Sequence, residues 1–384
     1  MEYTIALISG DGIGPEVSAW AVKALEKAAA GAGIRFIWKE LPAGGCAIDV
    51  YGVPLPDATL KAAQESDAVL LGAVGGPAWD GLPGHLRPER ALLGLRKGLG
   101  VYANLRPALL YSQLRGACPL TEEVLAASGD GGKLFDLMIV RELTGGIYFG
   151  ENGRGQATGD AAAEPAVSGA PYDYAFDTEK YSRFEVERVL HIAFNLAQKR
   201  QGRLCMVDKA NVLESSRFWR EITQELSRRY PSVEVSYMYV DNAAMQLVLA
   251  PRNFDVLVTS NLFGDILSDE AAAISGSIGM LASASIGGTA PDKRFPAALY
   301  EPIHGSAPDL AGKNLANPLA AILSAALMLR YSFGLEKEAS LIEKSVEKVL
   351  TLGYRTKDLM RGSLTNVKPA GTEEMGAAVL QAME

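Results

Sequence analysis

The sequence has few cysteines and few histidines, three of each among 384 residues. Cys46, Cys118 and Cys205 lie far apart and form no CxxC pair, which excludes a disulfide framework and a cysteine-rich zinc site. The first residues lack the basic segment, apolar core and cleavage site of a secretory signal, so we expect no such signal. Together these absences predict a protein of the reducing cytoplasm.

Long apolar runs and an excess of positive charge are also missing. The longest apolar stretch, residues 318–329, is shorter than the ~20 residues that cross a bilayer, so we expect a buried helix there. The 37 basic and 45 acidic side chains give a net charge of −8, which argues against nucleic-acid or membrane partners. With 48% apolar and 21% charged residues the chain is also not extensively disordered.

Strand-like and helix-like segments alternate along the chain. The strand-like segments are residues 3–8, 34–39, 67–72, 135–141, 203–208, 233–240 and 255–259. The helix-like segments are residues 15–30, 182–200, 213–230, 262–280, 318–333 and 337–352. This order predicts an α/β protein with a largely parallel central sheet. Residues 145–178 lack such periodicity and predict a projecting arm or loop.

A glycine-rich turn, residues 10–16, follows the first predicted strand with the sequence GDGIGPE. A dinucleotide-binding fingerprint that begins at Gly10 needs its third glycine at position 15, where Pro15 stands. Pro15 instead fits the first turn of a helix. The motif therefore predicts a tight strand-to-helix turn that lines a cleft.

Two aspartates, Asp265 and Asp269, are four residues apart in a predicted helix and share one of its faces. The segment is otherwise apolar, so the repulsion between the carboxylates favours a hard cation such as Mg²⁺ or Mn²⁺. Asp241 ends a predicted strand. It is either a third ligand or a helix N-cap, and its spacing does not decide between the two.

Arg96, Arg106 and Arg141 are candidates for binding an anionic substrate, because Arg141 ends an apolar strand, where α/β proteins usually bind ligands. Three guanidinium groups can bind two carboxylates bidentately, although any single arginine is more often an ion-pair partner on the surface.

One helical face carries Glu89, Leu92 and Leu93 beside Arg96, at i, i+3, i+4 and i+7. This face either holds an apolar substituent next to a carboxylate or packs its leucines in the core.

Two further residues have the chemistry of proton transfer. Lys209 directly follows a strand, and Tyr148 lies in a glycine-rich segment; a lysine can accept a proton and a tyrosine can donate one. Residues 304–312 form a loop of small residues that lets a backbone approach a ligand closely. Asp309 in this loop suits the two ribose hydroxyls of NAD and repels the 2′-phosphate of NADP, although the loop alone is only a turn.

These motifs, in this order, resemble the isocitrate/isopropylmalate dehydrogenase family of metal-dependent β-decarboxylating dehydrogenases. The resemblance is strongest in residues 141–148, 208–213, 260–270 and 304–312. It implies a two-domain α/β fold that is not a true Rossmann fold. Residues 1–100 and 255–384 then form the first domain, with both termini and the NAD-binding loop. Residues 101–254 form the second, with the dimer interface and an arm at about 145–178.

The resemblance also implies roles for single residues. Three arginines match those that bind the substrate carboxylates: Arg96, Arg106 and Arg141. Three aspartates match the ligands of the divalent metal: Asp241, which also contacts the substrate, Asp265 and Asp269. The proton-transfer pair corresponds to Tyr148 and Lys209. The adenosine site corresponds to His304, Gly305, Ser306, Ala307, Pro308, Asp309 and Asn317. The family shares its active sites across a homodimer, so Lys209 and Asp241 are expected from the second subunit.

The implied activity is the NAD-dependent oxidative decarboxylation of (2R,3S)-3-isopropylmalate to 4-methyl-2-oxopentanoate in leucine biosynthesis. This substrate is favoured because Glu89, Leu92 and Leu93 resemble the pattern that receives a branched alkyl group. The alternatives within the family are tartrate, malate, isocitrate and homoisocitrate. A catalytically silent regulatory subunit is disfavoured because every metal-binding and proton-transfer residue is present.

Overall fold

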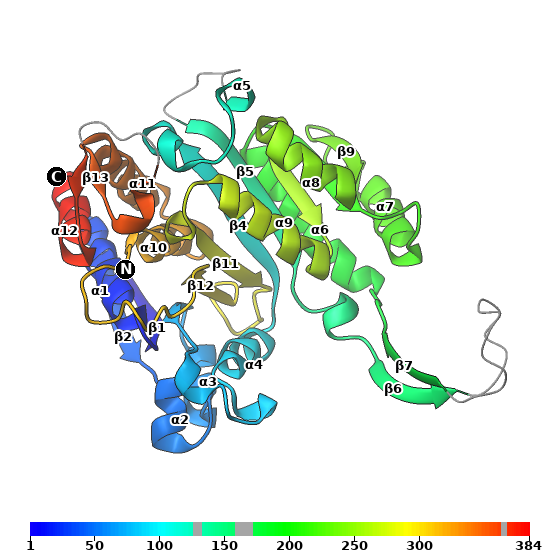
Figure 1. Ribbon diagram of the computed structural model, residues 1–384, viewed down its shortest axis with the longest axis horizontal. Helices are drawn as coiled ribbons and strands as arrows, with labels where there is room; N and C mark the ends of the chain where they lie inside the picture. The colour runs from blue at the N-terminus through cyan, green and yellow to red at the C-terminus, as the bar shows by residue number, and fades with distance from the viewer. Residues whose placement is uncertain (126–132, 158–171, 362–366) are drawn as a thin grey trace.

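The computed structural model describes residues 1–125, 133–157, 172–361 and 367–384. In these parts of the chain ten strands form one sheet in the order β2-β1-β3-β12-β11-β4-β5-β10-β8-β9 (Figure 1). Their bounds are β1 Glu2–Gly10, β2 Arg35–Glu40, β3 Ala68–Ala73, β4 Val101–Tyr111, β5 Lys133–Glu142, β8 Arg203–Asp208, β9 Glu234–Tyr239, β10 Val256–Thr259, β11 Ala282–Gly287 and β12 Ala298–Pro302. The pairing is parallel except that β4 runs antiparallel to β5 and β11, and β11 antiparallel to β12. The predicted α/β class is confirmed.

Helices cover both faces of the sheet (Figure 1). They are α1 Gly14–Ala29, α2 Gly45–Tyr51, α3 Asp57–Glu65, α4 Glu89–Leu99, α5 Glu122–Leu125, α6 Arg183–Lys199, α7 Glu214–Ser227, α8 Val240–Leu249, α9 Asn261–Ile274, α10 Leu319–Tyr331, α11 Glu336–Thr351 and α12 Thr372–Ala382. Helix α10 is buried on nearly every side between the sheet, α1 and α11, as its apolar sequence predicts. In the described parts of the chain we find no helix with the length and apolar character to span a membrane.

The first strand-to-helix turn is as tight as its glycines predict. Gly10 has φ +74°, and a Cβ atom there would lie 1.9 Å from the carbonyl oxygen of Ala73. Pro15 occupies the first turn of α1. One predicted boundary is wrong, because α9 ends at Ile274 and not at residue 280. The helix stops before Gly276, whose φ of +97° leaves the helical region.

Both chain ends lie on one side of the molecule, where α1 packs against α12 (Figure 1). The ion pair between Lys27 Nζ and Glu384 Oε1, at 3.0 Å, joins the two segments. At the opposite end, β6 Asn152–Ala157 pairs with β7 Tyr172–Asp177 in an antiparallel ribbon that projects from the body. The tip of this predicted arm, residues 158–171, lies outside the described residues.

The division into two domains stays a prediction, and the sheet suggests a different boundary. β10 pairs with β5 and β8, and α9 packs on β4, β5 and β10. We therefore propose that residues 255–274 belong with the second domain rather than with the first.

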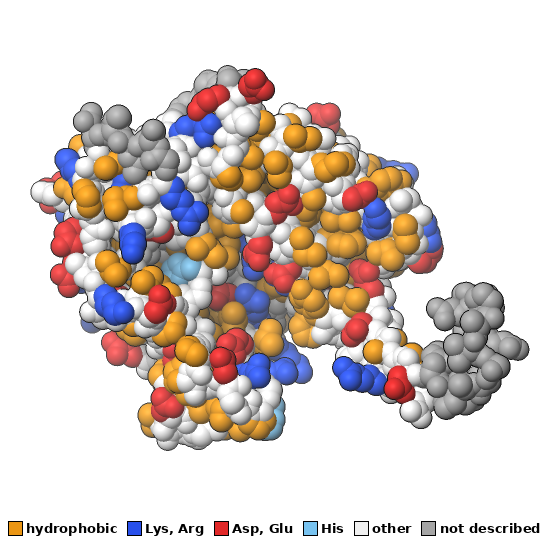
Figure 2. Space-filling model, viewed as in Figure 1, with side chains coloured by type: hydrophobic (Ala, Val, Ile, Leu, Met, Phe, Trp, Pro, Cys, Tyr) orange, Lys and Arg blue, Asp and Glu red, His pale blue; other side chains and the backbone are white. Residues whose placement is uncertain are grey.

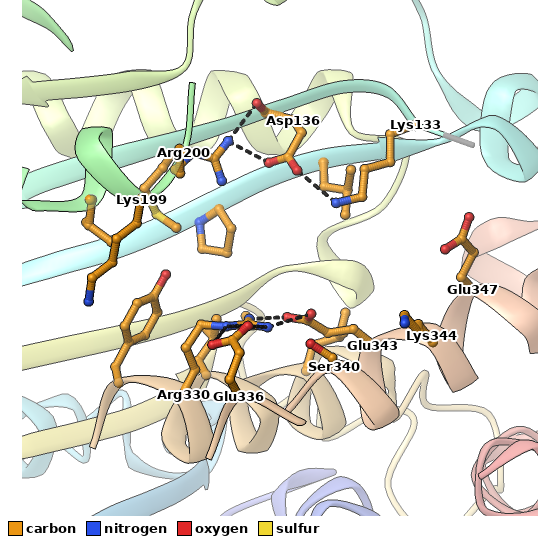
Figure 3. A pocket seen from close by; sticks show the side chains of 18 of the residues that line it. Lys133, Asp136, Lys199, Arg200, Arg330, Glu336, Ser340, Glu343, Lys344 and Glu347 are labelled. Atoms are coloured by element: carbon orange, nitrogen blue, oxygen red, sulfur yellow. Dashed lines mark hydrogen bonds and ion pairs between the residues drawn. The ribbon is translucent and has the colours of Figure 1, made fainter. Parts of the chain in front are cut away.

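A cavity of about 780 Å³ lies between α6 on one side and α10 and α11 on the other (Figure 3). Its floor consists of alternate residues of β4 and β5: Pro107, Leu109, Tyr111, Asp136 and Met138. Arg106 and Arg141 point to the other face of the sheet, because neighbouring residues of a strand alternate. Charged residues of the walls form ion pairs, such as Arg200 with Asp136 at 2.8 Å. This cavity therefore lies on the face opposite the predicted site.

Candidate active site

Several predicted site residues lie at the same edge of the sheet because β5, β10, β8 and β9 are parallel neighbours. Arg141 lies at the carboxyl end of β5, and α9 begins directly after β10. Lys209 follows β8, and Asp241 follows β9. The carboxyl edge of a parallel sheet is the usual ligand-binding edge of an α/β protein. The topology thus brings residues such as Arg141 and Asp265, which are more than 100 positions apart in the chain, to the same edge of the sheet.

The three arginines lie on α4, β4 and β5, close enough to act on one another's charge, and we call the region between α4 and α9 that holds them the groove. Arg141 forms an ion pair with Asp265, and Arg106 Nη1 lies 3.2 Å from Asp269 Oδ1. Arg96, on α4, pairs instead with Glu301 at 2.9 Å. In Figure 2 acidic and basic side chains meet in the hollow between the two halves.

Burial raises the free energy of the charged form of the guanidinium groups in this cluster. Burial, together with the neighbouring charges of Arg106 and Arg96, lowers the pKa of Arg141 to about 10, although Asp265 acts in the opposite direction. The pKa of Arg106 is also lowered, mainly by burial. Burial and the neighbouring positive charges make the charged forms of these guanidinium groups less stable. An anion bound between them would stabilise these charged forms, so the cluster favours an anionic ligand.

Asp265 and Asp269 share one face of α9, as their spacing predicts. They offer only oxygen atoms, which fits a hard divalent cation. Besides Arg141, Asp265 accepts a hydrogen bond from the hydroxyl of Tyr148, at 2.8 Å. Within the described residues of one chain, no group of three histidine, cysteine or acidic side chains converges on a common point. The two aspartates could therefore hold a cation only together with further ligands.

Asp241 lies apart from this pair and contacts Lys209, with 2.7 Å between Oδ1 and Nζ. It occupies the first turn of α8, whose N-cap is Tyr239, so the N-cap interpretation is wrong. The hydrogen bond from Lys209 lowers the pKa of the Asp241 carboxyl. The predicted third metal ligand is thus paired with the predicted proton acceptor.

Tyr148 lies in a 3-10 turn that its neighbours hold tightly. A Cβ atom on Gly145 would lie 2.8 Å from the Tyr181 ring, and the buried Glu142 carboxylate accepts the backbone N–H of Thr144 at 2.7 Å. Burial and the hydrogen bond to Asp265 raise the pKa of the Tyr148 hydroxyl. The hydroxyl therefore keeps its proton at neutral pH, as a proton donor must.

The predicted adenosine loop packs against the first strand-to-helix turn. The backbone N–H of Ile13 donates to the carbonyl of Ser306 at 2.8 Å. Burial lowers the pKa of His304, so its imidazole is neutral. The buried Nε2 of His304 has no hydrogen-bond partner among the described residues. A buried, unpaired ring nitrogen suits a polar group of a ligand.

Sequence reasoning missed Asp358, which lies beside this loop. Its carboxylate accepts hydrogen bonds from Asn317 Nδ2 at 3.0 Å and from Thr356 Oγ1 at 2.6 Å. The residue is 41 positions beyond Asn317, and no local pattern marks it. Only the packing of the region after β13 (Tyr354–Arg355) brings it there.

The predicted specificity residues lie on α4 at the groove. Glu89 Oε1 lies 3.0 Å from where a Cβ atom on Gly75 would be. Leu93 is 43% exposed, whereas Leu92 is partly buried against the core. One of the two leucines is thus open to a ligand.

Comparison with known proteins identifies relatives over the whole chain. Residues 4–379 match the family described as isocitrate/isopropylmalate dehydrogenase. The chain is 55% identical to a 3-isopropylmalate dehydrogenase of Clostridium acetobutylicum, with 99% of each chain covered. It is 52% identical to chloroplastic 3-isopropylmalate dehydrogenase 2 of Arabidopsis thaliana, with 100% of this chain and 88% of that protein covered.

Solved structures agree with these sequence relatives. The crystal structure of isocitrate dehydrogenase from Methylococcus capsulatus superposes with a TM-score of 0.77 at 34% identity, covering 99% of both chains. A β-decarboxylating dehydrogenase from Thermococcus kodakarensis gives a TM-score of 0.75 at 33% identity, covering 99% of this chain and 96% of that one. The resemblance seen in the motifs and the predicted fold are both confirmed.

Proposed function

The chain belongs to the isocitrate/isopropylmalate dehydrogenase family, and from this premise we propose that it oxidises and decarboxylates 3-isopropylmalate with NAD. The product is 4-methyl-2-oxopentanoate, and the reaction is a step of leucine biosynthesis. Relatives that carry the name 3-isopropylmalate dehydrogenase share more than half of its residues over nearly the full length. The observation that carries the proposal is the groove in which Arg106, Arg141 and Tyr148 meet Asp265.

The arginines bind and orient the substrate. Arg106 and Arg141 lie on one face of neighbouring strands and present their Nη atoms to the groove. A malate-type substrate has two carboxylates, and each fits the planar edge of a guanidinium group. Leu93 is exposed on α4, the helix that also carries Arg96, and would receive the branched alkyl group. Because apolar contact is worth only about 1–3 kcal/mol per methylene, related 3-alkylmalates are expected to react as well.

Mg²⁺ or Mn²⁺ would be held by Asp265 and Asp269 of one chain and Asp241 of a second. When bound, the cation would act as a Lewis acid on the substrate hydroxyl. Asp265 and Asp269 would then be ligands of the cation rather than partners of Arg141 and Arg106, whose guanidinium groups would bind the substrate.

Two side chains move protons. Lys209 accepts the hydroxyl proton as hydride leaves the substrate carbon for the nicotinamide. After carbon dioxide has left, the carbon that carried it needs a proton, and Tyr148 donates it. His304, Asp309 and Asn317 bind the adenosine of NAD, with Asp309 on the ribose hydroxyls.

A second copy of the chain completes the site. Apolar side chains gather over α8 and α9 (Figure 2), where Met245 is 55%, Leu249 60% and Ile266 56% exposed. An exposed apolar surface of this kind marks an interface. A partner seated on α8 and α9 brings its Lys209 and Asp241 toward this chain's Asp265 and Asp269.

The test is an assay of NADH formation by the purified protein with Mn²⁺. We expect 3-isopropylmalate to be oxidised with a kcat/KM far above those for isocitrate, homoisocitrate, tartrate and malate. EDTA should abolish the reaction, and Mn²⁺ should restore it. Preference for another acid, or activity that survives the chelator, would overturn the proposal.

A further inference from the structure

Two of the three groove arginines, Arg106 and Arg141, are held by a buried asparagine at the Nε edge of the guanidinium group. Arg106 Nε donates to Asn104 Oδ1 at 2.7 Å, and Arg141 Nε donates to Asn261 Oδ1 at 3.0 Å. Asn104 is fully buried and Asn261 is 1% exposed. The two arrangements come from different parts of the chain, yet each fixes an arginine in the same way.

Each asparagine is itself fixed by the fold. Asn104 lies directly opposite Arg141 in the pairing of β4 with β5, and its Nδ2 donates to Ser285 Oγ at 3.1 Å. The Nδ2 of Asn261 donates to the carbonyl of Gly145 at 3.2 Å. The amide planes are therefore set by β11 and by the turn that leads to Tyr148. Neither amide is free to rotate without losing a buried hydrogen bond.

Three arginines away from the groove have a carboxylate as the partner of Nε, whereas Arg252 Nε donates to the carbonyl of Leu134 at 2.7 Å. Arg200 Nε donates to the carboxylate of Asp255 at 2.8 Å, and Arg220 Nε donates to that of Asp208 at 2.5 Å. Arg330 Nε donates to both carboxylate oxygens of Glu336, at 2.9 Å. In these three arginines the carboxylate that accepts the hydrogen bond from Nε also neutralises the positive charge of the guanidinium group. For Arg106 and Arg141 a neutral amide is the partner of Nε, whereas Arg96, the third arginine of the groove, pairs with the carboxylate of Glu301.

The difference has an electrostatic consequence. An amide oxygen fixes the plane of a guanidinium group but carries no net charge, so the positive charge stays available at the Nη edge. The carboxylates on that edge are those of Asp265 and Asp269, which the proposed metal would bind. A permanent carboxylate at Nε would instead compete with an anionic substrate for the same charge.

We propose that these two asparagines are positioning residues that orient Arg106 and Arg141 and keep them uncompensated for the substrate's two carboxylates. The proposal rests on the function proposed above and adds a determinant of substrate affinity. It predicts that a negative charge in place of either amide weakens substrate binding without altering the fold.

The decisive variant is Asn104→Asp, which keeps the shape and the acceptor and adds one charge. Ser285 can donate to the new carboxylate, whereas the carbonyl of Ala284 loses the contact of 3.5 Å that Asn104 Nδ2 makes with it. We expect KM for 3-isopropylmalate to rise about tenfold or more, with kcat within about threefold of wild type and KM for NAD unchanged, because the lost interaction is one of uniform substrate binding. The salt dependence of KM should also weaken, since less of the binding is electrostatic.

Asn195→Asp is the matched control. Asn195 is exposed on α6, which packs on the opposite face of the sheet, so this variant adds the same charge away from the groove. Its KM should equal that of wild type. Asn261→Asp should raise KM in the same way and also lower kcat, because the carbonyl of Gly145 loses its donor beside Tyr148.

A wild-type KM in Asn104→Asp and Asn261→Asp, both folded by thermal melting, would overturn the inference. That result leaves the proposed function intact, since the wild-type enzyme still oxidises 3-isopropylmalate. Failure of wild type on this acid, with activity on another dicarboxylate, would overturn the function alone. The KM shift would then be measured on that acid.

Discussion

Tyr148 shows how a single residue obtains its role from several others. Its hydroxyl contacts Asp265 at 2.8 Å, its turn is fixed by Glu142, and its neighbours Gly145 and Gly146 pack against Tyr181. The two glycines are required there because a side chain would collide with the ring. The sequence marks Tyr148 only through its glycine-rich surroundings, whereas its partners come from β5, α6 and α9.

Replacing Tyr148 by phenylalanine removes the proton donor and keeps the ring. We expect kcat to fall about 100-fold or more, the usual contribution of a general acid, with KM within about threefold of wild type. Steady-state kinetics on 3-isopropylmalate measures both. Tyr174→Phe, on the exposed arm, is the control and should behave as wild type. Unchanged turnover in Tyr148→Phe would exclude Tyr148 from proton transfer.

His304 predicts a dependence of stability on pH. Burial lowers its pKa in the folded protein, so the unfolded chain binds a proton more readily. The stability that its neutral form contributes is present above the unfolded pKa of about 6.5 and is lost as the pH falls below it. Thermal melting between pH 7.5 and 5.5 should show a decline that His304→Gln reduces. An equal decline in both proteins would show that other groups cause it.

Among the elements, most of the longer helices and seven strands are predictable from the sequence because each has its own apolar pattern; the strands are β1, β2, β3, β5, β8, β9 and β10. β4 and β12 were not among the predicted strands. β11, with the sequence ASASIG, has no such pattern. It is a strand because β4 and β12 pair with it on both sides. The same holds for the site: spacing places Asp265 and Asp269 on one face, but only strand order brings Arg141 to them. Asp358 and the two asparagines likewise depend on long-range packing.

Helix α9 is positioned by the absence of a side chain at Gly264. A Cβ atom there would lie 2.6 Å from Arg141 Cγ, so Gly264→Ala overpacks the site. The overpacking costs about 1–3 kcal/mol, which exceeds the ~1 kcal/mol that alanine contributes to a helix. We expect a lower melting temperature and a raised KM for the substrate.

Gly288→Ala, directly after β11, is a control for the added methyl group alone, because no atom lies within 4 Å of the added Cβ. It should leave both the melting temperature and KM unchanged. A Gly264→Ala variant with wild-type KM would show that Arg141 tolerates displacement.

At the scale of the whole molecule, two halves are joined by one continuous sheet. The groove lies on one face of its central strands, and the cavity of about 780 Å³ lies on the other. Within one chain, no contact among the described residues joins Lys209 to Asp265: Lys209 contacts Asp241, and Asp265 contacts Arg141 and Tyr148. The proposed dimer supplies what the single chain lacks.

Mixing two inactive variants tests this sharing of sites. Lys209→Ala and Asp265→Asn each disable both sites of their own dimer. In a mixed dimer one site receives both intact residues, so random pairing restores about a quarter of wild-type activity. Co-expression of differently tagged chains, followed by an NADH assay, measures the recovery. No recovery in purified mixed dimers would place Lys209 and Asp265 in the same subunit's site.

The position of the two termini has a practical consequence. Both lie beside α1 and α12, on the side of the body away from the ribbon of β6 and β7 (Figure 1). An affinity tag, a fluorescent fusion or a surface linker attached at either end therefore stands clear of the groove and of α8. Enzyme immobilised through its termini should keep its substrate entrance facing the solution.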